Sequence, residues 1–320
     1  MKKLLLMSIL MLALIFAVVS CTNEGTDNST TVGQTTDELT VNAVTTAEEV
    51  TTEEVTTEAV ITEEVTTEEV TTEEVTTEEV TTEEESRVES ITIATYNIRH
   101  GADVDCDWTQ LAEIILQSGA DIIGLQEVDM NTNRIGGLDT MAGLAEATGY
   151  PYYYFAAAMD YDGGQYGTAI LSRYPSETHK TVHLNNGGFE PRACGAVTVI
   201  LPDGSPFCFL NTHLSYEDVT VQAQQFIQIE KWMKRNMPQN IPTVITGDFN
   251  TADFTAFSPF EKKGYALVNN AEHSYPTFRG SNSPIDNIVY LASYLTPVEH
   301  GMIDSDRSDH NLLWCQFKLN

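Results

Sequence analysis

Strand-length runs of apolar residues, separated by polar segments, repeat along the last 230 residues of the chain. Most of these runs are rich in Val, Ile, Leu, Phe or Tyr, as the strands of a buried sheet are. They occupy residues 91–96, 121–128, 167–172, 195–201, 207–213, 242–247, 285–291 and 311–318. The pattern therefore predicts eight strands.

Three helices are predicted between these runs from apolar residues at helical spacing. The first follows an N-cap at Asp107, the second spans about 139–148 and stops at Gly149, and the third spans about 219–237 and stops at Pro238. Helices alternate with strands in the first half of this region, and hairpins appear in the second half. We therefore expect one α/β domain with mixed sheets and with helices on the outside.

The first twenty residues have the pattern of a secretory signal peptide, in which two lysines precede an apolar stretch from Leu4 to Val19. The sequence V-V-S-C that ends at Cys21 resembles the lipid-attachment site of bacterial lipoproteins. This predicts a lipoprotein signal peptide over 1–20, acylation of Cys21, and an extracytoplasmic protein anchored to the bacterial cell membrane. An ordinary signal peptide followed by a chance cysteine is the alternative.

A repetitive acidic segment separates this leader from the domain. Valine recurs at every fifth position from Val50 to Val80, a period that matches neither a helix nor a strand, so no continuous apolar face can form. Residues 22–90 carry 21 acidic residues and one basic residue, and their mutual repulsion favours an extended chain. We expect 21–90 to be a disordered, lipid-anchored acidic stalk. A low-complexity expansion of no selected length explains the segment equally well.

The domain itself is also acidic. Residues 91–320 contain 26 Asp and Glu against 13 Lys and Arg. Nonspecific binding of nucleic acid relies on the opposite balance. The one dense basic cluster, Lys231, Lys234 and Arg235, lies on a predicted helix and not among the polar segments described below. Nucleic acid is therefore a possible partner but not a favoured one.

The cysteines of the domain are expected to be reduced. They occupy positions 106, 194, 208 and 315. The segment P-D-G-S at 202–205 predicts a hairpin that pairs position 194 with about position 213, which places Cys208 far along the ladder from Cys194. A disulfide between these two is therefore not expected.

Five short polar segments stand at the ends of predicted strands, where they supply carboxylates, amides and imidazoles. They are T-Y-N-I-R around Asn97, L-Q-E-V around Glu127, N-T-H-L around His213, G-D-F-N around Asp248 and Asn250, and S-D-H at Asp309 and His310. Hard oxygen ligands suit Mg²⁺ or Mn²⁺, and two histidines without a thiolate cluster suit proton transfer and stabilisation of an anionic transition state. This is the chemistry of phosphoester hydrolysis, and we expect the five segments to converge on one rim of the sheets.

The five segments, in this order and spacing, resemble the endonuclease/exonuclease/phosphatase superfamily over essentially all of 91–320. Four further segments support the resemblance: Y-G-T-A-I-L-S-R-Y-P at 166–175, E-P-R at 190–192, P-T-F at 276–278 and I-D-N-I at 285–288. It implies two mixed sheets packed face to face in a four-layer α/β/β/α sandwich. It also implies a Mg²⁺- or Mn²⁺-dependent phosphoric ester hydrolase that acts by attack of a metal-assisted water.

The resemblance also assigns roles to individual residues. Glu127 is the main metal ligand, with Asn97 and Asp309 near it. Asp286 pairs with His310 and stabilises its protonated form, and His213 hydrogen-bonds a nonbridging phosphate oxygen. Asp248 orients or deprotonates the attacking water, and Asn250 fixes Asp248.

Other residues have weaker assignments. Arg192 and Tyr166 are candidates for binding substrate, although a surface arginine beside Glu190 is equally ordinary. Arg134 is within reach of substrate, but a solvated loop is the better interpretation. The sequence departs from many relatives at Thr168, where they carry Asn, and this affects the substrate side of the site.

Small or lipid-borne phosphodiesters are expected as substrates ahead of DNA or RNA, because the domain is acidic and membrane anchoring keeps it near lipid headgroups. A nuclease is the alternative within the same chemistry. A non-catalytic surface binding module of the same fold is the alternative of another class. The domain is expected to be a monomer.

Overall fold

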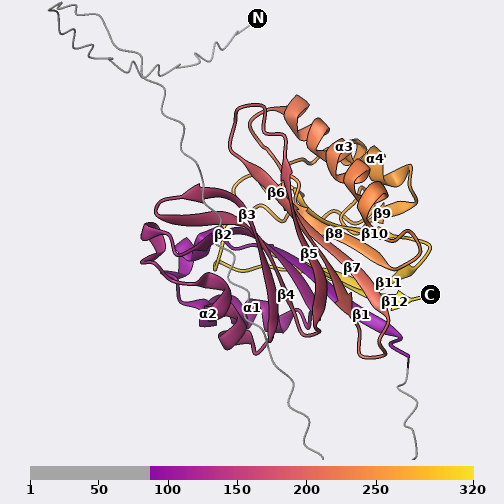
Figure 1. Cartoon of the computed structure of the whole chain (residues 1–320), viewed down its shortest axis with the longest axis horizontal. Coiled ribbons are helices and arrows are strands. Elements are labelled where there is room, and N and C mark those ends of the chain that lie inside the picture. Colours follow the sequence, from indigo (N-terminus) through magenta and orange to yellow (C-terminus); the bar gives the residue numbers. More distant parts are fainter. Residues whose placement is uncertain (1–86) are drawn as a thin grey trace, which may run out of the picture. The chain divides into compact units, whose positions relative to one another are not determined.

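The computed structural model describes residues 87–320, which form two six-stranded mixed β-sheets packed against each other (Figure 1). The first sheet has the strand order β11-β12-β1-β2-β4-β3 and the second has the order β5-β6-β7-β8-β10-β9. The predicted lipoprotein leader, Cys21 and nearly all of the predicted stalk lie outside the described residues.

The bounds of the strands follow the predicted runs closely. The first sheet contains β1 (Ser90–Asn97), β2 (Ile122–Met130), β3 (Tyr152–Tyr161), β4 (Gly164–Ser172), β11 (Leu295–Ile303) and β12 (Leu312–Leu319). The second contains β5 (Ser176–Leu184), β6 (Arg192–Ile200), β7 (Pro206–His213), β8 (Thr243–Asp248), β9 (Tyr265–Leu267) and β10 (Asp286–Leu291). All eight predicted strands are present with ends within three residues of their predicted positions. Strands β3, β5, β9 and β11 were not predicted.

The helices lie on the outer faces of the two sheets. Helices α1 (Trp108–Gln117) and α2 (Thr140–Thr148) cover the first sheet, and α3 (Val219–Asn236) and α4 (Ser258–Glu261) cover the second (Figure 1). Short 3-10 helices span Arg99–Val104, Asn133–Ile135 and Phe254–Phe257. The three longer helices start from capping aspartates whose side chains accept backbone N–H groups, at Asp107, Asp139 and Asp218. The predicted four-layer sandwich is confirmed.

The inner faces of the two sheets share one apolar core. It includes Ile93 and Phe317 from the first sheet and Phe209, Val244 and Ile288 from the second, all fully buried. Within residues 87–320, no helix combines the length and apolar character needed to span a membrane. The four cysteines of this part of the chain are unpaired, and Cys194 lies opposite Thr212 in the β6–β7 hairpin, one residue from the predicted position.

A buried polar network joins the sheets just below their rim. The Asn211 side chain of β7 donates to the carbonyl oxygens of Leu125 (2.7 Å) and Ala169 (2.8 Å) in the other sheet, and its Oδ1 accepts from Gln126 (2.6 Å) and Thr246 (3.1 Å). All of these side chains are fully buried, so each hydrogen bond replaces one lost to water. The network therefore fixes one sheet relative to the other at this level.

We expect Asn211→Leu to lower the free energy of unfolding by on the order of 3 kcal/mol, because it leaves several buried polar groups without a partner. Urea unfolding of the purified protein measures this. The same substitution at the exposed Asn236, near the end of α3, serves as the control and should change stability little. A loss at Asn211 no larger than at Asn236 would show that the network does not stabilise the sandwich.

Candidate active site

Three of the predicted site residues lie side by side where strands of the second sheet meet the rim. His213 ends β7, Asp248 ends β8 and Asp286 begins β10. In the ladder His213 is the register partner of Asp248, and Asp248 is the register partner of Asp286. Strand pairing alone therefore brings together residues that are separated by up to 73 positions in the sequence.

The first sheet contributes Asn97, at the end of β1, and Glu127, in β2. Glu127 has a left-handed backbone (φ 53°) where the β2–β4 register shifts by a bulge, an irregularity that redirects a side chain toward the rim. The amide of Asn97 donates to Glu127 Oε1 (3.1 Å) and to Asp248 Oδ2 (3.2 Å). The Asn97 NH₂ group has two hydrogens, one for each carboxylate, so Asn97 bridges the two sheets, and its Oδ1 accepts from the Arg99 amide (3.0 Å).

His310 and Asp286 form a tight buried pair. His310 Nδ1 lies 2.8 Å from Asp286 Oδ2, and the two side chains are 4% and 1% exposed. Burial lowers the pKa of an imidazole, but the negative charges of Asp286 and Asp248 outweigh it and raise the pKa of His310 above its usual range. His310 is therefore held as an imidazolium at neutral pH. Thr277, from the P-T-F segment, accepts from the Asp286 amide at 3.0 Å and helps to hold that residue.

Asp248 is the point on which the other groups converge. Its Oδ2 lies 3.5 Å from His213 Nε2 and 3.6 Å from His310 Nε2, and it accepts from Asn97. Burial and then the charge of Asp286 raise the pKa of Asp248, which makes its carboxylate a stronger base than an exposed one. Asn250, whose backbone also has a left-handed conformation (φ 53°), donates its N–H to Asp248 Oδ1 at 2.9 Å.

Arg192 determines which nitrogen of His213 carries the proton. Arg192 Nη1 lies 3.0 Å from His213 Nδ1, and a guanidinium can only donate. His213 Nδ1 must therefore be an acceptor, and its proton must sit on Nε2, which faces Asp248. Burial and the charge of Arg192 both lower the pKa of His213, so this histidine is neutral. Arg192, predicted to contact substrate, is itself only 3% exposed and lies 2.9 Å from Glu190.

Arg192→Met is expected to lower kcat about 10- to 100-fold, the usual effect of losing a group that orients a functional histidine. Arg192→Lys keeps one hydrogen-bond donor near His213 Nδ1, so its kcat should lie between that of Arg192→Met and that of the unaltered protein. The Nδ1 and Nε2 chemical shifts of His213 provide a second measurement, because they report the tautomer directly. Unchanged shifts in Arg192→Met would contradict the assignment.

The oxygen donors at the rim fit a hard divalent cation. Burial alone would raise the pKa of Glu127, but the neighbouring histidines, His100 foremost, and the amide of Asn97 outweigh it and bring the pKa down to about 2, so the carboxylate is ionised. The Glu127 side chain is 26% exposed, and it lines the same pocket as Asp309. Ligand atoms of Asp248, Asp286 and His310 also lie within 4.8 Å of one another. A protonated His310 cannot ligate a metal, so the residues that would hold the cation are those around Glu127.

These groups open into one pocket of about 480 Å³. Eight of the predicted site residues line it: Glu127, Tyr166, Arg192, His213, Asp248, Asn250, Asp309 and His310. Asn97 and Asp286 lie directly behind them through the hydrogen bonds above. Burial and then the charge of Glu127 raise the pKa of Tyr166 well above its usual value, so its hydroxyl remains a donor. Cys21 lies outside the described residues.

Several pocket residues had no role predicted from the sequence. Met159 and Tyr161 come from the unpredicted strand β3, Tyr216 from the loop after β7, and Phe278 packs its ring 5.0 Å from the His310 ring. The dipeptide Asp162-Gly163, which follows the mostly apolar residues 152–161, is a hairpin signal that would have identified β3. Thr168 lies behind the pocket, 2% exposed, and its hydroxyl has no partner among the described residues.

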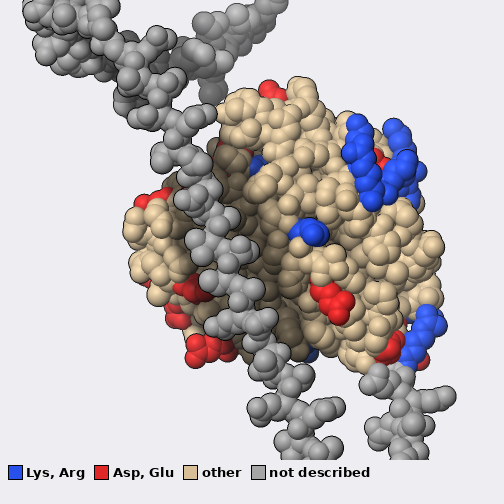
Figure 2. Space-filling view, viewed as in Figure 1, with Lys and Arg blue, Asp and Glu red and all other residues tan. Residues whose placement is uncertain are grey.

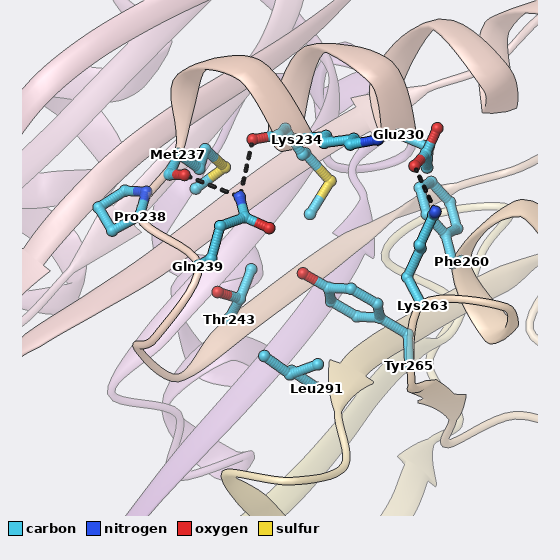
Figure 3. Close-up of a pocket in the computed structure, with 11 residues that line it drawn as sticks. Glu230, Lys234, Met237, Pro238, Gln239, Thr243, Phe260, Lys263, Tyr265 and Leu291 are labelled. Carbon is cyan, nitrogen blue, oxygen red and sulfur yellow. Dashed lines mark hydrogen bonds and ion pairs between the residues drawn. The ribbon is translucent and has the colours of Figure 1, made fainter.

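A second pocket, of about 310 Å³, lies at the opposite end of the second sheet and contains none of the predicted site residues (Figure 3). It is lined by Thr243, at the start of β8, by Tyr265, and by side chains from the end of α3, including Lys234. The Gln239 side chain donates to the Met237 carbonyl at 2.9 Å on one side of the pocket, and Lys263 Nζ lies 3.7 Å from Glu230 Oε1. The basic end of α3 is therefore far from the rim that carries His213 and Asp248.

Comparison with known proteins agrees with this architecture. The uncharacterized protein YbhP of Escherichia coli K12 is 29% identical over 150 residues, which cover 44% of this chain and 58% of that protein, so the match spans little more than half of the relative. An endonuclease/exonuclease/phosphatase from Beutenbergia cavernae superposes with a TM-score of 0.64 at 22% identity over 73% of this chain and 72% of the other. The mannosyl-6-phosphatase Bt3783 of Bacteroides thetaiotaomicron superposes with a TM-score of 0.54 at 21% identity, over 71% of this chain and 99% of that protein. Residues 94–310 match the model of the endonuclease/exonuclease/phosphatase family, and the chain belongs to that family.

Proposed function

We propose that this protein is a divalent-metal-dependent phosphoesterase that hydrolyses small or lipid-borne phosphodiesters. The observation that carries the proposal is the convergence, in one pocket, of the ionised Glu127 with a neutral histidine and a charged one. His213 is fixed by Arg192 and His310 by Asp286. A site built only for stability has no need of two buried histidines held in opposite charge states.

The side chains of the pocket have different roles in an in-line displacement at phosphorus. Asp248, held by the Asn250 amide, accepts the proton of the attacking water. The bond from phosphorus to the leaving-group oxygen breaks on the side opposite the water, and that oxygen leaves as an alcohol once it takes up a proton. His213 Nε2–H and the His310 imidazolium donate to the phosphate as negative charge develops on its oxygens. A cation held by Glu127, with Asp309 nearby, would stabilise the same charge as a Lewis acid when bound.

The surface charge supports a small substrate over a long polyanion. The cations that gather on the view in Figure 2 belong to the end of α3 and the segment after α4, where Lys231, Lys234, Arg235, Lys262 and Lys263 are exposed. This group lies at the end of the sandwich opposite to the catalytic rim. The arginines near the rim, Arg99, Arg134, Arg279 and Arg307, each lie within 4 Å of an aspartate carboxylate. A duplex bound across the rim would therefore meet cations that are already paired with acids, whereas binding of a polyanion relies on lysines and arginines that neutralise its phosphates.

A substrate panel tests the proposal. Headgroup phosphodiesters, a small chromogenic phosphodiester, and single- and double-stranded DNA are compared by kcat/KM at equal Mg²⁺ and low salt. The proposal predicts the highest values for the small and lipid-borne substrates. A preference for DNA that falls steeply with salt would identify a nuclease, and an absence of turnover with every phosphoester would identify a binding module.

We also propose that Cys21 anchors the protein to the outer face of the cell membrane. Cys21→Ser should move the protein from the membrane fraction to the soluble fraction, because acyl chains hold through their buried methylene groups. Fractionation followed by immunoblotting measures this. Continued retention of the Cys21→Ser protein in the membrane fraction would place the anchor elsewhere.

A further inference from the structure

Arg134 is held at the wall of the catalytic pocket by a buried acid. Its Nε lies 2.6 Å from Asp129 Oδ2 and its Nη2 lies 2.7 Å from Asp129 Oδ1, in a bidentate pair. Asp129 is fully buried in β2, two residues beyond Glu127, and it also accepts from the Thr132 hydroxyl at 2.5 Å. The loop that follows Glu127 is thus fixed to the strand, contrary to the solvated loop preferred from the sequence.

The β3–β4 hairpin holds the same arginine from the other side. Its turn residue Asp162 accepts from the Arg134 backbone amide (2.7 Å). The Arg134 guanidinium lies over the rings of Tyr161 and Tyr166, at 4.7 Å and 5.6 Å from their centroids. At Gly164, in the same hairpin, an added Cβ would lie 2.2 Å from the Met130 carbonyl oxygen, so the close approach of hairpin and loop requires glycine there.

Stability alone does not account for this arrangement. Burying a carboxylate costs free energy that a salt bridge often fails to recover, and an apolar pair of the same volume is frequently more stable. The pair instead presents a charged group in a defined orientation. Arg134 is 31% exposed, it lines the pocket that contains His213 and His310, and its Nη1 has no hydrogen-bond or ion-pair partner within residues 87–320.

We infer that Arg134 forms a second anion-binding subsite, so that the preferred substrate carries a further phosphate or carboxylate beside the scissile phosphate. This rests on the proposed phosphoesterase function, whose site it extends. The same geometry disfavours choline-type headgroups, because the faces of Tyr161 and Tyr166 that would receive a quaternary ammonium are covered by the guanidinium. Glu190 leaves the subsite cationic, because its carboxylate is paired with Arg192 at 2.9 Å.

Binding of two nucleotides that differ by one phosphate tests the inference. Dissociation constants of thymidine 5′-phosphate and thymidine 3′,5′-bisphosphate for the full-length protein are measured by calorimetry with Mg²⁺ present, and chromatography checks that both remain intact. The bisphosphate should bind about tenfold or more tightly, because a guanidinium–phosphate hydrogen bond is charge-assisted. Phosphocholine should bind more weakly than the bisphosphate.

The paired substitution Asp129→Asn with Arg134→Gln removes both charges and leaves no unpaired buried acid. It should bring the ratio of the two dissociation constants to about threefold or less, whereas Arg235→Gln, on the exposed end of α3, should leave the ratio as it was. Arg134→Lys keeps a cation on the loop and should give an intermediate ratio.

Equal binding of the two nucleotides by the unaltered protein, or a ratio that survives the paired substitution, would overturn the inference. The measurement does not depend on turnover. A protein that selects the bisphosphate but hydrolyses no phosphoester would therefore keep the subsite and contradict the proposed function.

Discussion

His310→Ala is expected to lower kcat by a factor on the order of 10² or more, because the site loses a charged hydrogen-bond donor to the transition state. His310 is 4% exposed and its charge is maintained by Asp286 at 2.8 Å. The loss should appear in kcat more than in KM, since the charge that His310 stabilises develops during the displacement. Steady-state kinetics on the best substrate of the panel measures both.

Asp286→Asn gives a matched test of the same pair. It keeps a hydrogen-bonding group beside His310 Nδ1 but removes the carboxylate charge that favours the imidazolium, so kcat should also fall. Exchange of the exposed His183 for alanine is the control and should leave kcat unchanged. Near-normal kcat in His310→Ala, with the fold intact by circular dichroism, would assign His310 a structural role.

Glu127→Gln is expected to raise the Mg²⁺ concentration needed for half-maximal activity by on the order of tenfold or more, because the cation loses its one ionised ligand in β2. The fold should be retained, since Gln is nearly isosteric and Oε1 can still accept from Asn97. A titration of activity against Mg²⁺ at saturating substrate measures the shift.

The same substitution at Glu113, exposed on α1, controls for the loss of one negative charge from the domain. It should leave the Mg²⁺ titration unchanged. An equal Mg²⁺ requirement in the unaltered protein and in Glu127→Gln would place the cation away from Glu127.

The four strands that were not predicted, β3, β5, β9 and β11, are the four edge strands of the two sheets. Interior strands pack on both faces and read as apolar runs, whereas an edge strand needs fewer apolar residues. β5 exposes most of its residues, and β11 contains Pro297, where its register with β12 shifts. Pattern alone therefore identifies the interior of the sandwich better than its boundaries.

The site residues also differ in how well the sequence predicts them. Residues at the ends of interior strands, such as His213 and Asp248, were predicted from the sequence because their polar segments directly follow apolar runs, and the register of β7 with β8 then brings them together. The roles of Arg192 and Arg134 were not predicted, because both depend on what surrounds the guanidinium. Arg192 is buried against His213, and Arg134 is held by the buried Asp129 and by an edge hairpin. Contacts of this kind have no fixed spacing in the sequence.

Loss and recovery of activity with a chelator test the central claim most directly. The purified protein is assayed on a small phosphodiester, then with excess EDTA, and again after Mg²⁺ or Mn²⁺ is restored. The arrangement around Glu127 predicts that EDTA abolishes hydrolysis and that either cation restores it, with Glu127→Gln requiring more of the cation. Full turnover in the presence of EDTA would contradict the proposal that this is a metal-dependent phosphoesterase.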